Sequence, residues 1–179
     1  MSTPAVSAQP QLYIYDHCPF CCRARVAFGL KKVPHDMLFL ANHDEATPIG
    51  LVGSKQAPIL VPVGGKPFAE SWDIVAYIDA HYGGAPVLQP ASGRQDLAQW
   101  VDAAMPLLVK LYLPRFHAAS AARFHAARVA RLLQAQDRVS VGAFSDNLAQ
   151  SAELVKQVNA LFVQLGAAAA LGLVGQRRR

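Results

Sequence analysis

Hydrophobic positions in the first half of the chain follow a strand-like pattern in some segments and a helix-like pattern in others. Short aromatic and β-branched runs predict strands at 12–15, 37–40, 58–61 and 66–68, with Gly64 and Gly65 in a tight turn before the last. Apolar residues at helical spacing, including Val26, Ala27 and Leu30, predict helices from Pro19 onward, over 44–51 and over 71–82. The expected order of elements is therefore β-α-β-α-β-β-α.

The second half of the chain has a different pattern. Glycine and proline interrupt all periodicity over 83–90, which predicts a linker at 84–93. Beyond it, Ala, Leu, Val and Gln recur at helical spacing over 96–110, 118–135 and 141–165, with interruptions at Pro106, Pro114 and 137–140. We expect a disordered extension at 1–10, a first domain at 11–83 and an all-helical domain at 94–179.

Composition favours a folded globular protein. Of the 179 residues, 53% are hydrophobic and only 16% are charged, so enough apolar surface exists to offset the entropy of folding. The net charge is +5, but residues 177–179 alone contribute three arginines. A nucleic-acid partner is not expected, because it would require a clustered basic face.

Neither end of this sequence has the pattern of a targeting or membrane-spanning segment. Residues 1–10 lack the basic start and apolar run of a secretory signal and the arginines of a mitochondrial presequence, so we expect a cytoplasmic protein. Residues 157–176 carry no charge, but Gln164 and many alanines and glycines make them less apolar than a membrane span. No membrane association is expected.

All three cysteines lie within five positions, which excludes a framework of disulfides between distant segments and indicates redox chemistry or a metal. Cys18 precedes a helix, where free N–H groups and the helix dipole stabilise a thiolate, so it is the candidate nucleophile. Cys21 returns to the same face as a candidate resolving thiol. The alternative is a pair of buried structural cysteines.

Neighbouring residues in the same helix are assigned lesser roles. Cys22 is predicted to be a buried apolar thiol beside Val26. Arg23 and Arg25 are expected to be solvated, although either guanidinium could add positive potential to a Cys18 thiolate.

Two further sites gain meaning from the cysteine motif. Pro58 opens a strand after Ala57, and a cis proline there would present the preceding backbone to a thiol peptide; taken alone, it is an ordinary edge proline. Ser71, after Glu70, is predicted to cap a helix whose free N–H groups could hold a carboxylate. Beside a redox cysteine, Glu70 and Ser71 suit the carboxylate and amine of a γ-glutamyl group.

Several motifs together resemble one family. YIYDHCPFC at 13–21, GSKQAPIL at 53–60, ESWDIV at 70–75 and LYLPRF at 111–116 are similar to segments of the bacterial type-2 glutaredoxins, which have a glutathione-transferase fold. The resemblance covers residues 11 to about 165. It implies an α/β thioredoxin-like N-terminal domain packed on an all-α C-terminal domain, with glutathione in the cleft between them.

The resemblance also implies roles for individual residues. Cys18 corresponds to the family's nucleophile and Cys21 to its second thiol. The implied glutathione site consists of Pro19, Phe20, Ala57, Pro58, Glu70 and Ser71. Glutathione is then the reducing co-substrate, glutathionylated or disulfide-containing proteins are the partners, no metal or tightly bound cofactor is required, and a monomer is expected.

Two features depart from the family pattern. Phe20 replaces the tyrosine most common between the cysteines, which keeps an aromatic wall but removes a hydroxyl. The family's helical domain continues for several tens of residues, whereas residues 167–179 match none of it. We therefore expect a shortened helical domain with an exposed apolar groove, and hence lower stability or association.

The leading hypothesis is a glutathione-dependent thiol–disulfide oxidoreductase that acts on protein–glutathione mixed disulfides through Cys18. An omega-like glutathione transferase with the same nucleophile is a second enzymatic hypothesis. A metal or iron–sulfur module using the three cysteines is a third, although structural zinc sites usually take four ligands from two separated pairs. A catalytically silent interaction scaffold is the fourth.

Overall fold

The computed structural model describes residues 8–41, 43–91, 93–121 and 141–176. The chain forms two compact units, Met1–Pro90 and Ala91–Arg179. Their boundary lies inside the segment 84–93, where the sequence predicts a linker.

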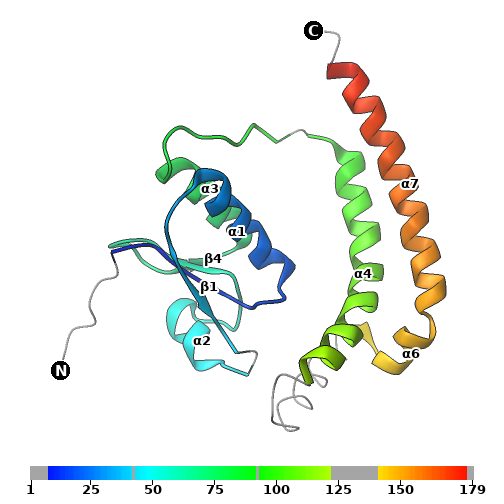
Figure 1. Ribbon diagram of the computed structural model, residues 1–179, viewed down its shortest axis with the longest axis horizontal. Coiled ribbons are helices and arrows are strands. Elements are labelled where there is room, and N and C mark those ends of the chain that lie inside the picture. Colours follow the sequence, from blue (N-terminus) through cyan, green and yellow to red (C-terminus); the bar gives the residue numbers. More distant parts are fainter. Residues whose placement is uncertain (1–7, 42, 92, 122–140, 177–179) are drawn as a thin grey trace. The chain divides into compact units, whose positions relative to one another are not determined.

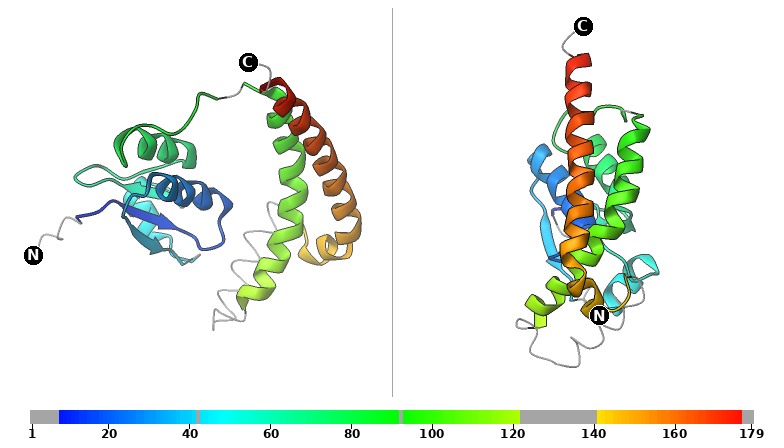
Figure 2. Two further views of the ribbon diagram at one scale, coloured as in Figure 1. Left: turned by 45° about the horizontal axis from the view of Figure 1, so that its top comes forward. Right: turned by 90° about the vertical axis from the view of Figure 1, so that its right-hand side faces the viewer.

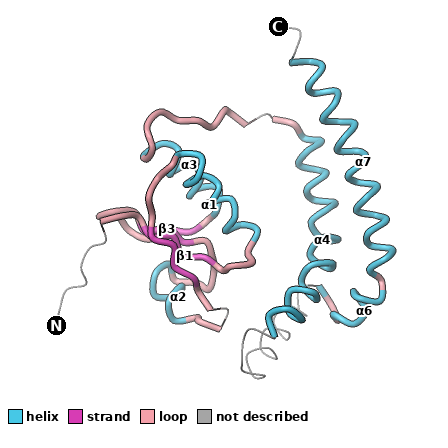
Figure 3. Tube along the Cα trace, in the orientation of Figure 1, coloured by secondary structure: helices cyan, strands magenta, loops and turns pink. Residues whose placement is uncertain are grey.

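The first unit contains a four-stranded mixed sheet in the order β2-β1-β3-β4, drawn in magenta in Figure 3. Its strands are β1 (Gln11–Ile14), β2 (Asp36–Phe39), β3 (Ile59–Val61) and β4 (Phe68–Ala69). β1 pairs in parallel with β2, whereas the β1–β3 and β3–β4 pairs are antiparallel. The predicted returning strand at 66–68 is therefore shifted and short, because Pro67 cannot donate to the ladder and lies outside it.

Three helices cover the two faces of this sheet. They are α1 (Pro19–Lys31), α2 (Ala46–Val52) and α3 (Ser71–His81). α1 and α3 lie side by side on one face, and α2 lies on the other (Figure 1). The predicted order β-α-β-α-β-β-α is confirmed.

The core of the first unit lies between the sheet and the pair α1 and α3. On β1, Leu12 and Ile14 are fully buried, as the period of two along a strand requires. The buried residues of α1 are Cys21, Ala24, Ala27, Phe28 and Lys31. Of the apolar residues that predicted this helix, Ala27 is buried, whereas Val26 and Leu30 are 58% and 60% exposed. The buried stripe of α1 is instead the one that contains Phe28.

Lys31, near the end of α1, is buried and holds the chain that leaves α3. Its ammonium lies 3.4 Å from the Asp79 carboxylate and donates to the backbone carbonyls of Asp79, Gly84 and Ala85. Gly83 has φ +62° and packs so closely that a Cβ there would lie 2.3 Å from the Lys31 carbonyl oxygen. Lys31 therefore ties residues 83–85 to the first unit.

The expected N-terminal disorder does not reach β1. Pro10 is buried and its carbonyl accepts a 2.9 Å hydrogen bond from the Asp36 N–H, so it extends the pairing of β1 with β2. Residues 8 and 9 form an exposed bend, and the rest of that prediction concerns residues 1–7, which lie outside the described residues.

The second unit is helical in its described part. Its helices are α4 (Gln95–Ala121), α6 (Phe144–Ala149) and α7 (Ser151–Gln176). α4 and α7 run antiparallel side by side, and α6 lies at the end where α7 begins (Figure 2). None of the helices in this part of the chain, or in the described part of the first unit, is long and apolar enough to cross a membrane.

Three predicted features of the helical half need correction or lie outside the description. α4 continues through Pro106 and Pro114 and packs against α7, although each proline removes a backbone hydrogen bond and its ring crowds the preceding turn. The predicted helix at 141–165 is divided at Gln150, and α7 extends through the alanine run to Gln176, as the high helix propensity of alanine favours. Most of the predicted helix at 118–135 lies outside the described residues.

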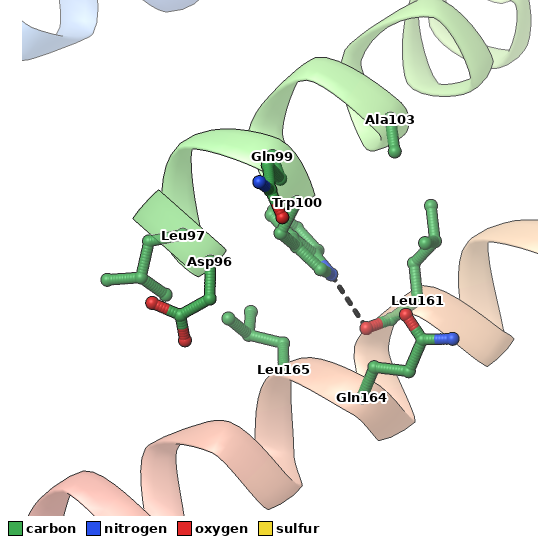
Figure 4. A pocket seen from close by; sticks show the side chains of 8 residues that line it. All are labelled: Asp96, Leu97, Gln99, Trp100, Ala103, Leu161, Gln164 and Leu165. Atoms are coloured by element: carbon green, nitrogen blue, oxygen red, sulfur yellow. Dashed lines mark hydrogen bonds between the residues drawn. The ribbon is translucent and has the colours of Figure 1, made fainter. Parts of the chain in front are cut away.

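Trp100 anchors α4 to α7. Its indole Nε1 donates to the Leu161 carbonyl at 2.6 Å, and its ring lies 5.4 Å from the ring of Phe162. Beside it the two helices leave a cavity of about 270 Å³, shown in Figure 4. The cavity is lined by Asp96, Leu97, Gln99, Trp100, Ala103, Leu161, Gln164 and Leu165.

Candidate active site

Cys18 lies where the chain passes from β1 into α1. It is the N-cap residue, with extended backbone angles (φ −79°, ψ 121°), and Pro19 takes the first helical position. The Cys18 sulfur accepts a hydrogen bond from the Cys21 N–H at 3.3 Å. The sulfur thus takes the place of the oxygen that usually caps a helix, at the positive end of the helix dipole.

These surroundings lower the pKa of Cys18 to about 6. The largest cause is the hydrogen bond from the Cys21 thiol, followed by the N–H groups of Cys21 and Phe20 and the positive charge of Arg23, while burial acts in the opposite direction. Since a thiolate is the nucleophilic form of cysteine, Cys18 is largely in its reactive form at neutral pH.

The other two cysteines have opposite environments. Cys21 is buried, and its pKa is raised because its thiol donates to the Cys18 sulfur and because burial disfavours its charged form. Cys22 is exposed, so the prediction of a buried thiol beside Val26 was wrong. The reason is the rotation of α1, which buries the stripe through Cys21 and Phe28 and turns Cys22 and Val26 outward. All three cysteines are free thiols.

The Ala57–Pro58 peptide bond is cis. Pro58 is buried directly before β3, and Ala57 is half-buried against the same core that Cys18 contacts. β3 is an inner strand of the sheet, so Pro58 is not an edge proline.

Glu70 and Ser71 begin α3 in a different way from the prediction. Glu70 takes the N-cap position with a left-handed backbone (φ 77°) and no side-chain capping bond, and Ser71 is the first helical residue. Ser71 therefore does not cap the helix; its hydroxyl accepts a 3.2 Å hydrogen bond from Nη1 of Arg23. The first N–H groups of α3 remain without a side-chain cap.

Arg23 connects the beginning of α1 with the beginning of α3. Besides its bond to Ser71, its guanidinium lies 5.1 Å from the ring centroid of Phe20 and 4.7 Å from that of Trp72. Both contacts are cation–π interactions. The expectation of a solvated Arg23 was therefore wrong, whereas Arg25, two residues on, is exposed.

A cavity of about 290 Å³ lies between these segments of the first unit. It is lined by Phe20, Arg23, Gln56, Ala57, Pro58, Glu70, Ser71 and Trp72. Five of the predicted substrate-site residues are among them, whereas Pro19 is not. Cys18, the N-cap residue of α1, and Cys21, in the first turn of α1, lie outside the lining.

Three lining residues were missed by the sequence analysis, namely Arg23, Gln56 and Trp72. The spacing of three between Phe20 and Arg23 was a usable signal, because residues three apart share a helix face. No local signal links Arg23 to Trp72 or Ser71, which lie on another helix. In the part of the chain that is described, no three His, Cys, Asp or Glu side chains are grouped as metal ligands.

Two family models match this chain. Residues 12–86 match the N-terminal domain of glutathione S-transferases, and residues 96–171 match the C-terminal domain of glutaredoxin 2. Glutaredoxin 2 of Escherichia coli K12 is 38% identical over 151 residues, which cover 83% of this chain and 68% of the relative. Glutaredoxin 2 of E. coli O157:H7 matches equally well.

Solved structures show the same likeness. Glutaredoxin 2 from Salmonella typhimurium, in complex with glutathione, superposes with a TM-score of 0.77 at 36% identity, covering 87% of this chain and 70% of that one. A glutathione S-transferase of Ceriporiopsis subvermispora, also with glutathione, has a TM-score of 0.70 at 18% identity, covering 88% and 72%. The second likeness shows a shared glutathione-transferase fold.

Proposed function

The chain belongs to the glutaredoxin 2 family, and from this premise we propose that it is a glutathione-dependent thiol–disulfide oxidoreductase whose nucleophile is Cys18. The observation that carries the proposal is the place of the Cys18 sulfur at the N-cap of α1, where it accepts a 3.3 Å hydrogen bond from the Cys21 N–H and its pKa is lowered. The natural substrates in this proposal are protein–glutathione mixed disulfides, and a reducing compartment such as the cytoplasm supplies the glutathione.

The reaction proceeds by two thiol–disulfide exchanges. The Cys18 thiolate attacks the glutathione sulfur of the mixed disulfide, the bond between the two sulfurs breaks, and the protein sulfur leaves with the electron pair and takes a proton from solvent. A second glutathione, as thiolate, then attacks the glutathione sulfur bound to Cys18. This step releases oxidised glutathione and regenerates the Cys18 thiolate.

The cavity beside Cys18 suits the glutathione part of the substrate. Ala57, whose bond to Pro58 is cis, offers backbone groups to the cysteine residue of glutathione, and Phe20 forms an apolar wall. The uncapped N–H groups at the start of α3, with Ser71, suit the γ-glutamyl carboxylate. Pro19 contributes by setting the direction of the first turn of α1.

Cys21 has a supporting role in this cycle. Its thiol donates to the Cys18 sulfur and so stabilises the thiolate, but its own raised pKa makes it a poor nucleophile while Cys18 is ionised. When Cys18 is in a mixed disulfide, the anion beside Cys21 is absent. Cys21 is therefore suited to resolve dithiol substrates only after the first exchange.

The proposal is tested by glutathione-dependent reduction of a mixed disulfide between glutathione and a small thiol. Cys18→Ser is expected to reduce turnover by a factor of about 100 or more, because a hydroxyl cannot replace the thiolate. Cys21→Ser is expected to retain turnover, at a rate lowered by the loss of its hydrogen bond to Cys18. Cys22→Ser, which removes the exposed thiol, is the matched control and leaves turnover unchanged.

Other outcomes would contradict the proposal. A folded wild-type protein without turnover would indicate a silent scaffold. Loss of all activity in Cys22→Ser, with activity kept in Cys18→Ser, would show that the nucleophile is Cys22 and not Cys18.

A further inference from the structure

Two large aromatic side chains are exposed at the edge of the cavity of about 290 Å³ in the first unit. Trp72, in the first turn of α3, is 64% exposed, and Phe20, in the first turn of α1, is 43% exposed. Both residues line the cavity, and Phe20 lies only two positions after Cys18. An open indole and an open phenyl ring beside a candidate site indicate a surface that a partner covers, because burying such rings is strongly favourable.

Arg23 connects the two rings. Its guanidinium lies 5.1 Å from the ring centroid of Phe20 and 4.7 Å from that of Trp72, and its Nη1 donates to the Ser71 hydroxyl at 3.2 Å. These contacts join α1 to α3, so the three side chains lose little freedom when a partner binds to them. Phe20, Arg23 and Trp72 are named the rim cluster below.

The rim cluster has hydrogen-bond donors that the described part of the chain does not use. There, the indole N–H of Trp72 has no partner, and Arg23 uses one of the five N–H groups of its guanidinium. Open aromatic rings beside free donors suit a polypeptide, which offers apolar side chains together with carbonyl and carboxylate oxygens. Tryptophan and arginine are also among the residues that most often dominate the binding energy of a protein interface.

We propose that the rim cluster binds the polypeptide part of a glutathionylated protein and favours an acidic residue next to the modified cysteine. The inference rests on the proposed function, which places the glutathione part of the mixed disulfide in the cavity and leaves the polypeptide part outside it. Phe20 and Trp72 contact apolar atoms of that polypeptide. Arg23 and the Trp72 indole donate to its oxygens.

Other charges near the rim cluster keep the preference for an acidic residue modest. Glu70 lines the same cavity, and its carboxylate pairs with the ammonium of the γ-glutamyl group when glutathione is bound. Asp73, directly after Trp72, is exposed and acts against an acidic partner. The net charge of the whole chain, +5, attracts such a partner over a longer range. Arg23 is therefore expected to contribute about as much as one favourable surface ion pair.

The first test compares two glutathionylated peptides that differ only in a glutamate or a glutamine beside the modified cysteine. The wild type is expected to show a kcat/KM about fivefold higher for the glutamate peptide. Arg23→Gln should lower this ratio to about one, whereas Arg25→Gln, at an exposed arginine of the same helix, is the matched control and keeps it. Any effect of a variant on Cys18 cancels, because both peptides react with the same thiolate.

The second test measures binding without turnover and uses Trp72 as the probe. The chain has two tryptophans, so Trp100→Phe leaves Trp72 as the only indole. In this variant, with Cys18→Ser and Cys22→Ser added to prevent disulfide exchange, the glutamate peptide is expected to shift the fluorescence emission to the blue, because the polypeptide covers the indole. S-methylglutathione, which has no polypeptide part, should shift it less. Trp72→Phe, which leaves only Trp100, is the control and shows no shift.

The outcomes separate this inference from the proposed function. If the wild type reduces both peptides equally well, or if Trp72 responds no more to the peptide than to S-methylglutathione, the inference is refuted and the oxidoreductase proposal stands. If Arg23→Gln keeps the fivefold preference, the carboxylate is recognised elsewhere, and the inference is also refuted. A wild type that reduces none of the mixed disulfides refutes both. Thermal unfolding of each variant excludes a general loss of structure.

Discussion

The two units of this chain bury apolar residues to very different extents. In the first unit the sheet, α1 and α3 enclose a continuous core that includes Leu12, Phe28 and Ile78, all at most 1% exposed. In the described part of the second unit, the buried apolar residues are Ala104, Phe144, Leu154 and Val158. Meanwhile Val163, on α7, is 75% exposed.

The contrast follows from architecture rather than composition. A sheet with helices on both faces buries strands from two sides, whereas two paired helices bury only the stripe along which they meet. All the residues assigned to the proposed site belong to the first unit. The chemistry is thus supported by the better packed part of the chain, and we expect the first unit to open with a higher free energy than the helical one.

The largest expected effect concerns the core of the first unit. Phe28→Ala removes a fully buried ring and is expected to destabilise this unit by about 3–5 kcal/mol. Hydrogen exchange of the β1 amides measures the loss. Leu30→Ala, at an exposed position of the same helix, is the control and should cost under about 0.5 kcal/mol. Equal losses in the two variants would show that α1 does not pack as described.

The next effect concerns the buried lysine at the end of α1. Lys31→Met removes the donor to three backbone carbonyls, and we expect a loss of about 2–3 kcal/mol with increased exchange over residues 83–88. Lys32→Met, at the exposed neighbouring position, should be close to neutral. Protection of 83–88 that survives Lys31→Met would mean that the packing of Gly83 and the hydrogen bonds from the Val87 and Leu88 N–H groups to Asp79 hold this segment without the lysine.

A smaller effect is expected in the helical unit. Trp100→Phe keeps an aromatic ring near Phe162 but removes the hydrogen bond to the Leu161 carbonyl, which we expect to cost about 1 kcal/mol. Exchange of the α7 amides should increase, while that of the β1 amides stays constant. A matching increase in β1 would show that the two units unfold together. Trp72→Phe, in the first unit, controls for loss of an indole.

The last prediction is that a change in the helical unit has no effect on the reactivity of Cys18. The rate of Cys18 alkylation should rise as pH increases through about 6, because the thiolate is the reactive form. Below that pH the thiolate is protonated and the rate falls. Trp100→Phe should leave this profile unchanged, since Cys21, Phe20 and Arg23, which lower the Cys18 pKa, all lie in the first unit. A shifted midpoint would show that the helical unit influences the thiolate.

The sequence predictions succeeded for features that depend on residues close together in the chain. The order of strands and helices in the first unit follows from periods of two and 3.6, and the place of Cys18 at a helix start follows from Pro19 and the preceding strand. In α1, however, two stripes carry apolar residues, and the prediction placed the one with Cys22 and Val26 inward. Cys22, Val26 and Leu30 form one, and Cys21, Ala24 and Phe28 the other. Hydrophobicity alone did not distinguish them, and packing against α3 buries the second.

In the helical half, the error came from giving too much weight to single residues. Pro106 and Pro114 predicted interruptions of a helix that continues through both of them. A proline inside a helix has a local cost, and a long α4 also packs along α7. A single sequence does not reveal which of these two free energies is larger.

The sequence by itself determined the order of elements in the first unit, the candidate nucleophile Cys18 and the family, because these depend on residues close together in the chain. The tertiary structure decided which side of α1 is buried, that Arg23 meets Ser71, and that Lys31 meets Asp79. Each of these pairs joins α1 to α3 across 48 positions. Such contacts depend on how two helices settle on one sheet, and no spacing along the chain encodes that arrangement.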